Sequence, residues 1–273
     1  MLISYFLDLV GQGLSDQVTW EDSLCGKFSK ESTVPLRFEK TRLYVSTLAA
    51  QLYCEQKVDF EERFGKEDKE VQKVGTEIHN ALVPTEIIET EDLIDEIKKK
   101  RVYTTIFPTI YEHDGVIISG IHDGLIFKNG KPVYLIEIKT TRNPKNLQRV
   151  HAGERFQAFL YFLSLEQMGF DVSNLKILIP KVLQDVRRDS FIPSLIRYLD
   201  DNKEDFENQF EGKIRIHKYS LTEKRRRDTL SKIEDLVQYW REQRPPTGVD
   251  TYFKCKYCDF NTSCQKSLFR PLQ

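Results

Sequence analysis

The sequence predicts an α/β fold with a mixed sheet flanked by helices. Three observations predict it: helical periodicity near the start of the chain, a strand-rich stretch at 102–140, and a helix at 146–168 with further strands behind it. Helices, a meander of strands, a helix and more strands are together typical of one mixed α/β domain. We place this domain at residues 40–273, behind an arm at 1–39 whose structural signals are weak.

Composition limits the functions open to the chain. Of its 273 residues, 40 % are hydrophobic and 11 % aromatic, which is enough for a substantial core. The 41 basic and 42 acidic residues leave a net charge of −1, which argues against a protein coated in positive charge. Basic stretches at 98–101, 181–188 and 224–227 still permit a basic channel on a neutral protein.

The chain shows no signal peptide, and no apolar run approaches the ~20 residues that span a bilayer. We therefore expect a soluble, intracellular protein without a membrane partner, located in the cytoplasm or, in a eukaryote, in the nucleus or mitochondrion.

Two helices open the predicted domain. The first runs from Ser46, a suitable N-cap, to a stop at Gly65. The second covers 68–83, where apolar residues recur at helical spacing, and a charged helical stretch follows at 90–100.

Strands come next, at 102–111, 114–127 and 132–140, all rich in Val, Ile, Thr, Tyr and Phe. The dipeptide Asn129-Gly130 between the last two is a strong β-hairpin signal.

The C-terminal part begins with the helix at 146–168 and alternates further elements. We expect strands at 175–180 and 213–221, a charged amphipathic helix at 222–243, and a cysteine-bearing tail at 250–266.

The hairpin carries charged side chains where a buried strand should be apolar. Asp123, Glu137 and Lys139 stand among Ile, Leu, Val and Tyr, and a buried carboxylate is costly unless it is paired or binds a metal. Alternation along a strand places Glu137 and Lys139 on the same face. Whether Asp123 joins them depends on the register of the hairpin.

Two registers are open. A strict two-residue turn would set Asp123 opposite Ile136 and on the wrong face. A three-residue loop, or a β-bulge near Gly120 or Gly124, would align Asp123 with Glu137.

Aligned in this way, the two carboxylates and the lysine form a candidate metal site. Adjacent carboxylates repel unless a cation lies between them, and hard oxygen ligands suit Mg²⁺ or Mn²⁺. The ion could activate water while the lysine neutralises a phosphate in the transition state. The alternative is an ordinary surface hairpin with a Glu–Lys pair, which the apolar neighbours disfavour.

Three cysteines in the tail have metal-ligand spacing: Cys255, Cys258 and Cys264 form C-x2-C-x5-C. A tetrahedral site or a four-cysteine cluster needs one more ligand, either Cys54 or Cys25. We favour Cys54, which lies just before the predicted core, and expect Cys25 to be a free thiol. Spacing alone does not separate zinc from a [4Fe–4S] cluster.

The hairpin pattern resembles the PD-(D/E)XK nuclease superfamily, in which an Asp ends one strand and Glu-x-Lys lies on the next. Two further motifs resemble its RecB-type branch. "GTEIHNAL" supplies His79 as an upstream metal ligand, and "ERFQAFLYFL" supplies Gln157 and Tyr161, four residues apart on one helix face.

The cysteine layout resembles the iron–sulfur nucleases of this branch, most closely the exonuclease V family, whose helix start is similar to Leu48–Gln56. CRISPR-associated iron–sulfur nucleases share the layout. The resemblance implies that Cys54, Cys255, Cys258 and Cys264 bind a [4Fe–4S] cluster, which would link the tail to the early helix.

What the resemblance implies is a Mg²⁺- or Mn²⁺-dependent exonuclease acting on single-stranded DNA, with a preference for 5′ ends and a role in DNA repair or processing. Asp123 and Glu137 would bind the ion, with His79 and the Ile138 carbonyl as further ligands. Lys139 would orient the water or stabilise charge.

Two side chains would engage the DNA. Gln157 and Tyr161 would position the strand, unless Tyr161 is a core residue. A single-strand-binding protein or a helicase would be a further partner. The alternatives are a CRISPR spacer-processing nuclease and a non-catalytic DNA-binding module with an iron–sulfur or zinc centre.

Overall fold

The computed structural model describes residues 31–66, 97, 99, 102–186, 191, 194–195, 198–199, 210–249 and 251–269. The predicted helix at 68–83, with His79, lies outside these residues, as do Cys25 and most of the predicted arm. No helix within the described ranges is long and apolar enough to cross a membrane.

The described strands form two sheets. The smaller sheet has the order β1-β4-β3, with β1 parallel and β3 antiparallel to β4. The larger one contains β2, β5, β6, β7, β8 and β9. In chain order the strands are β1 (Leu43–Tyr44), β2 (Val102–Thr105), β3 (Pro108–His113), β4 (Val116–Ile121), β5 (Gly124–Lys128), β6 (Lys131–Ile136), β7 (Lys139–Thr141), β8 (Lys176–Leu183) and β9 (Ile214–Tyr219).

The larger sheet is built around β8. On one side β6 and β7 pair with β8 in parallel, and both keep the same register, from Ile136↔Leu178 to Lys139↔Lys181. On the other side β9 pairs antiparallel. The β5–β6 hairpin and β2 extend the sheet beyond β6. The short gap between β6 and β7 therefore interrupts a pairing with β8 that continues in the same register on both sides of the gap.

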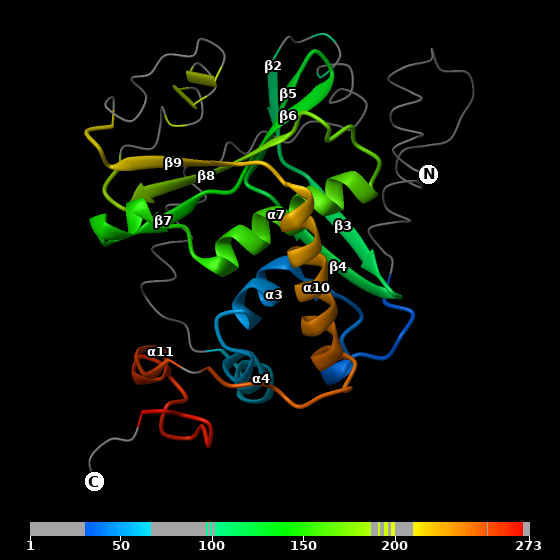
Figure 1. The fold of residues 1–273 in the computed structure, drawn as a ribbon, viewed down its shortest axis with the longest axis vertical. Helices are drawn as coiled ribbons and strands as arrows, with labels where there is room; N and C mark the ends of the chain where they lie inside the picture. Colours follow the sequence, from blue (N-terminus) through cyan, green and yellow to red (C-terminus); the bar gives the residue numbers. More distant parts are fainter. Residues whose placement is uncertain are drawn as a thin grey trace.

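The helices are α3 (Val45–Gln51), α4 (Glu55–Phe64), α7 (Ala152–Gln167), α10 (Glu223–Trp240) and α11 (Tyr252–Lys256), with short 3₁₀ turns η1 (Arg37–Glu39) and η2 (Pro144–Gln148). Helix α7 crosses in front of the sheet, and α3 and α10 pack beside it (Figure 1). The tail with α11 lies next to α4 (Figure 1).

Alternation along the strands divides the apolar residues between two cores. Leu125, Leu135 and Ile177 join the core that also contains α7, whereas Ile136 and Leu178 join a second core on the other face. A sheet covered on both faces needs nearly continuous apolar strands, which is why the charged residues of this hairpin stand out.

The predicted mixed α/β fold is confirmed, with differences at element boundaries. The helix predicted from Ser46 to Gly65 is broken, because Cys54 adopts an extended backbone (φ −166°, ψ 111°) between α3 and α4. The stop at Gly65 is confirmed, with φ 86° at the C-cap, but the N-cap is Tyr44 rather than Ser46.

The predicted strands at 102–111 and 114–127 are each two strands, one in each sheet. The predicted strand at 132–140 is also two, β6 and β7, on either side of Glu137 and Ile138. The predicted helix at 146–168 starts six residues later, at Ala152, because η2 and a short extended segment precede it.

Candidate functional site

The β5–β6 hairpin has the two-residue turn that Asn129-Gly130 predicts. Both turn residues have positive φ (52° and 75°), and Lys128 pairs directly with Lys131. This conformation matches the right-handed twist of the flanking strands, and Asn followed by Gly adopts it readily. The alternative of a three-residue loop is therefore wrong.

A β-bulge corrects the register. Ile126 pairs with Tyr134, but Phe127 pairs with Pro132, so Val133 is an extra residue on β6. The shift brings Gly124 opposite Ile136, and one step further Asp123 comes level with Glu137. The expected β-bulge is present, but it lies closer to the hairpin turn than the predicted positions near Gly120 and Gly124. It sets both carboxylates on the α7 face.

Asp123 occupies the point where the hairpin separates. On the N-terminal side of Gly124 the chain comes from β4, which belongs to the other sheet. The pairing between β5 and β6 therefore ends at Gly124. The Asp123 carboxylate replaces it, because Oδ2 accepts a hydrogen bond of 2.6 Å from the Ile138 amide. On the opposite edge the Glu137 amide still donates to the Leu178 carbonyl, at 3.0 Å. The interruption between β6 and β7 thus holds Asp123 beside Glu137.

Lys139 completes the cluster. Its Nζ donates to Glu137 Oε1 at 2.7 Å and to Gln157 Oε1 at 2.8 Å. Burial works against the charge of this lysine, but the Glu137 carboxylate outweighs it and raises the pKa of Lys139. The raised pKa keeps Lys139 in its charged form at neutral pH.

Gln157 and Tyr161 lie on the face of α7 that covers this cluster, but they differ in exposure. Gln157 is partly exposed and contacts Lys139. Tyr161 is 2 % exposed, and its hydroxyl donates to the Ile121 carbonyl at 2.9 Å. Burial raises the pKa of Tyr161, which keeps the hydroxyl protonated. Of the two roles that the sequence leaves open, the geometry favours a core residue that fixes the end of β4.

Gly120 makes room for that contact. A Cβ at Gly120 would lie 2.8 Å from the Tyr161 ring, closer than real side chains approach one another.

Burial also affects His122, a residue to which the sequence motifs assign no role. Its ring lies edge-on to Phe107 and Tyr161, and it is 1 % exposed. Burial, opposed by the neighbouring Asp123 carboxylate, lowers the pKa of His122 to about 4, so the ring is neutral at physiological pH.

The residues present fit a divalent cation. Asp123 and Glu137 are 8 % and 2 % exposed, and they supply hard oxygen ligands on one face of the sheet. The proposed third side-chain ligand, His79, lies outside the described residues.

Elsewhere, a group of ligating atoms within 4.8 Å of one another is formed by His113, Asp114 and Glu234, at the β3–β4 turn and α10. His113 Nε2 and Glu234 Oε2 are already joined there by a hydrogen bond of 2.7 Å.

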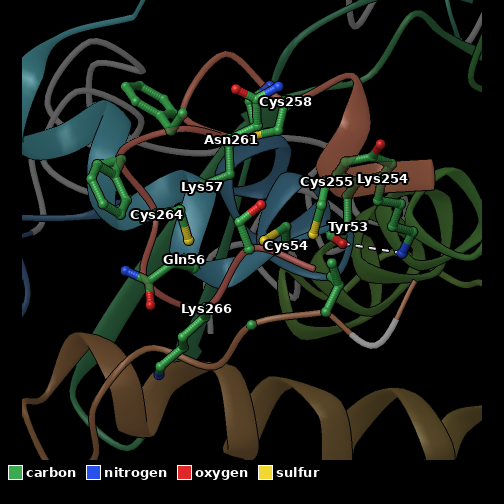
Figure 2. Close-up of a pocket in the computed structure, with 15 residues that line it drawn as sticks. Tyr53, Cys54, Gln56, Lys57, Lys254, Cys255, Cys258, Asn261, Cys264 and Lys266 are labelled. Atoms are coloured by element: carbon green, nitrogen blue, oxygen red, sulfur yellow. Dashed lines mark hydrogen bonds between the residues drawn. The ribbon is translucent and has the colours of Figure 1, made fainter. Parts of the chain in front are cut away.

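The four predicted cluster ligands line one pocket between α4 and the tail (Figure 2). Burial raises the pKa of the Cys54 and Cys258 thiols, so without a metal they are protonated at neutral pH. Among the described residues, no three of the four sulfur atoms lie within 4.8 Å of one another. The four thiols are therefore not clustered as the close ligand set of a single ion.

Two further charge pairs next to these sites were not predicted. Lys181 on β8 binds Glu154 on α7 at 2.6 Å, and Arg244 binds Glu55 through two nitrogens, at 2.5 and 2.9 Å. Their partners are 27 and 189 residues apart, so no local pattern could reveal the pairs. A weak signal exists for Glu154, because it precedes Gln157 by one helical turn.

Comparison with known proteins covers most of the chain. A family model described as "PD-(D/E)XK nuclease superfamily" matches residues 28–265. Among solved structures, one titled "Crystal structure of SSO0001" is 16 % identical, with a TM-score of 0.45 and 98 % of each chain covered. The family match includes the hairpin, both its carboxylates and the tail as far as Cys264.

Proposed function

Because the chain belongs to the PD-(D/E)XK nuclease superfamily, whose members are nucleases that use divalent metal ions, we propose that it is an exonuclease for single-stranded DNA. We further propose that it prefers 5′ ends and acts in DNA repair or processing. The nuclease chemistry follows from the family, and the choice of substrate rests on the sequence resemblance to exonuclease V.

One observation carries the chemical part of the proposal: the bulged hairpin aligns Asp123 with Glu137, and Lys139 binds that same glutamate. Asp123 and Glu137 would hold Mg²⁺ or Mn²⁺, with His79 and the Ile138 carbonyl as further ligands. When bound, the ion would lower the pKa of a coordinated water molecule and stabilise negative charge on the phosphoryl oxygens.

The chain's own residues prepare the site for phosphate chemistry. Lys139, held as a cation by Glu137, faces the negative charge that develops on the phosphoryl group. Gln157 fixes the lysine from the other side, so the ammonium keeps its position before the substrate arrives. The backbone on both sides of the Glu137 side chain is fixed, because the Glu137 amide donates to the Leu178 carbonyl and the Ile138 amide donates to Asp123.

The proposal is tested by incubating end-labelled single- and double-stranded DNA with freshly purified protein and Mg²⁺. We expect degradation of the single strand from an end, blocked by EDTA. Asp123→Ala should abolish cleavage while DNA binding persists, because binding depends chiefly on basic contacts to phosphates. Cleavage by Asp123→Ala near the wild-type rate would show that the site is elsewhere.

Glu112→Ala is a matched control. It removes a carboxylate from β3 in the smaller sheet, and its cleavage rate should equal that of the wild type.

For the second cofactor we propose a [4Fe–4S] cluster bound by Cys54, Cys255, Cys258 and Cys264. The proposal rests on the resemblance of the cysteine layout to the iron–sulfur nucleases. The cluster would stabilise the fold by tying the tail to the start of α4.

Replacing Cys258 by Ser should release iron, remove visible absorbance and lower the melting temperature, since metal binding is coupled to folding. Cys25→Ser is the control and should retain both iron and stability. Stoichiometric zinc without iron in anaerobically purified protein would contradict the cluster. Loss of iron in Cys25→Ser would mean that the fourth ligand is Cys25 instead of Cys54.

Two alternatives are separated from this proposal, one by its neighbouring genes and the other by the cleavage assay. A CRISPR spacer-processing nuclease would cleave DNA but would be encoded beside CRISPR genes. A non-catalytic DNA-binding module would bind DNA without Mg²⁺-dependent cleavage. The Asp123, Glu137 and Lys139 cluster speaks against the second alternative.

A further inference from the structure

A row of three polar contacts joins α7 to the sheet at the candidate active site. Glu154, Gln157 and Tyr161 occupy positions i, i+3 and i+7 of the helix, so they share one face. They contact Lys181, Lys139 and the Ile121 carbonyl in turn. The last two contacts belong to the nuclease site described above, which leaves the Glu154–Lys181 pair unexplained.

Lys181 and Lys139 are neighbours across the sheet. They are register partners on β8 and β7, and paired residues of adjacent strands point to the same face. Adjacent strands lie about 4.8 Å apart, so two ammonium groups extend side by side toward α7. Each finds its own carboxylate: Lys139 binds Glu137 at 2.7 Å and Lys181 binds Glu154 at 2.6 Å.

Burial decides what Lys181 can do. Its side chain is 2 % exposed, against 22 % for Lys139, so it does not reach a DNA phosphate. Glu154 is 19 % exposed, and its second oxygen accepts a 2.8 Å hydrogen bond from the His151 amide at the start of α7. The pair can therefore influence the reaction through Lys139, not through direct contact with the substrate.

We propose that Lys181 is a positioning residue of the nuclease site that acts through Glu154. By binding Glu154, it keeps this carboxylate from taking Lys139 away from Glu137, since Glu154 and Gln157 are adjacent on the helix face. This role rests on the nuclease function proposed above.

The test compares Lys181→Met, Glu154→Gln and the double variant in Mg²⁺-dependent cleavage of single-stranded DNA, at a temperature where a melt shows each to be folded. Lys181→Met should lower kcat by about tenfold to a hundredfold with little change in KM, the range expected for a misplaced catalytic group. Glu154→Gln should stay close to wild type, because the amide oxygen can still accept from His151 and no longer attracts Lys139.

The double variant is decisive. Replacing both charges removes the competing carboxylate, so kcat should return to within a few-fold of wild type, even if Lys181→Met alone does not fold. A folded Lys181→Met with wild-type kcat would refute the role of Lys181. A double variant that stays slow, or has no folded state, would refute action through Glu154.

Wild-type protein is the reference for both proposals. Absence of cleavage by the wild type would remove the nuclease function and this inference with it. Wild-type cleavage combined with equal cleavage by Lys181→Met would remove the inference alone.

Discussion

Single residues of this protein show how burial sets protonation. The half-buried Lys139 and the buried His122 both lie near Asp123. The Glu137 carboxylate binds Lys139 directly and raises its pKa, whereas burial dominates at His122 and lowers its pKa to about 4. One group is therefore held charged and the other neutral across physiological pH.

The lowered pKa of His122 makes stability depend on pH. A histidine with an unfolded pKa near 6.5 and a folded pKa of about 4 binds its proton more readily in the unfolded state. Its contribution to stability is complete above pH 6.5 and is lost as the pH falls toward 4. The loss should amount to about 3 kcal/mol, at 1.36 kcal/mol per pKa unit.

Urea unfolding of EDTA-treated protein at several pH values between 7 and 4 measures this effect. His122→Leu should show a smaller fall in the free energy of unfolding over that interval. Parallel curves for wild type and variant would place the pH dependence in other groups.

At the level of elements, α7 and α3 approach each other through Gly153. A Cβ added there would lie 2.8 Å from the Ala49 carbonyl oxygen, and a backbone atom cannot move aside as a side chain can. Because α7 carries Gln157 and α3 leads to Cys54, this contact joins the two functional regions.

Gly153→Ala should therefore destabilise the protein by about 1–3 kcal/mol, the usual cost of overpacking, although alanine favours helix formation. Denaturant midpoints compare this variant with the wild type. A midpoint unchanged or raised would show that the helices separate without cost.

How far the sequence predicts the structure follows from the range of each interaction. The turn at Asn129-Gly130 and the stop at Gly65 depend on local backbone preference and are confirmed. The extra residue Val133 and the break at Cys54 depend on how distant strands and helices pack, so the sequence left the hairpin register open and fused two helices.

In the candidate site, too, the range of each interaction decides what the sequence can predict. Asp123, Glu137 and Lys139 could be selected from the sequence because charged residues interrupt apolar strands. The burial of Tyr161 and the Glu154–Lys181 pair could not, because each depends on the docking of α7 against strands far away in the chain.

On the scale of the whole molecule, the C-terminal segment is attached to the start of the domain by a buried polar network. Glu55 is 3 % exposed and receives Arg244 through two nitrogens and the Thr247 amide at 2.7 Å. Burial alone would raise the pKa of Glu55, but the Arg244, Gln51 and Thr247 hydrogen bonds outweigh it and lower the pKa. The segment that leads to the tail is thus held next to Cys54 by this network and by a 3.0 Å hydrogen bond from the Gln56 amide to the Thr247 carbonyl.

Glu55→Gln should lower the free energy of unfolding by about 1.5–3 kcal/mol, because it weakens the charge-assisted hydrogen bonds from Arg244 to a side chain that is 3 % exposed. The matched control is Glu62→Gln, which breaks a 2.9 Å pair with Lys40 whose side chains are about a quarter exposed. That change should cost less than about 1 kcal/mol. Equal losses in urea unfolding would show that the Glu55 network is not a special attachment.

The extra residue Val133 also constrains how this hairpin can change in evolution. Because strand side chains alternate, inserting or deleting one residue between Asp123 and Glu137 turns one carboxylate to the opposite face of the sheet. Such an insertion or deletion is tolerated only if a second one returns both carboxylates to the same face of the sheet. Among functional descendants of this sequence, the hairpin should therefore lengthen or shorten by two residues at a time, or exchange its bulge for a three-residue turn.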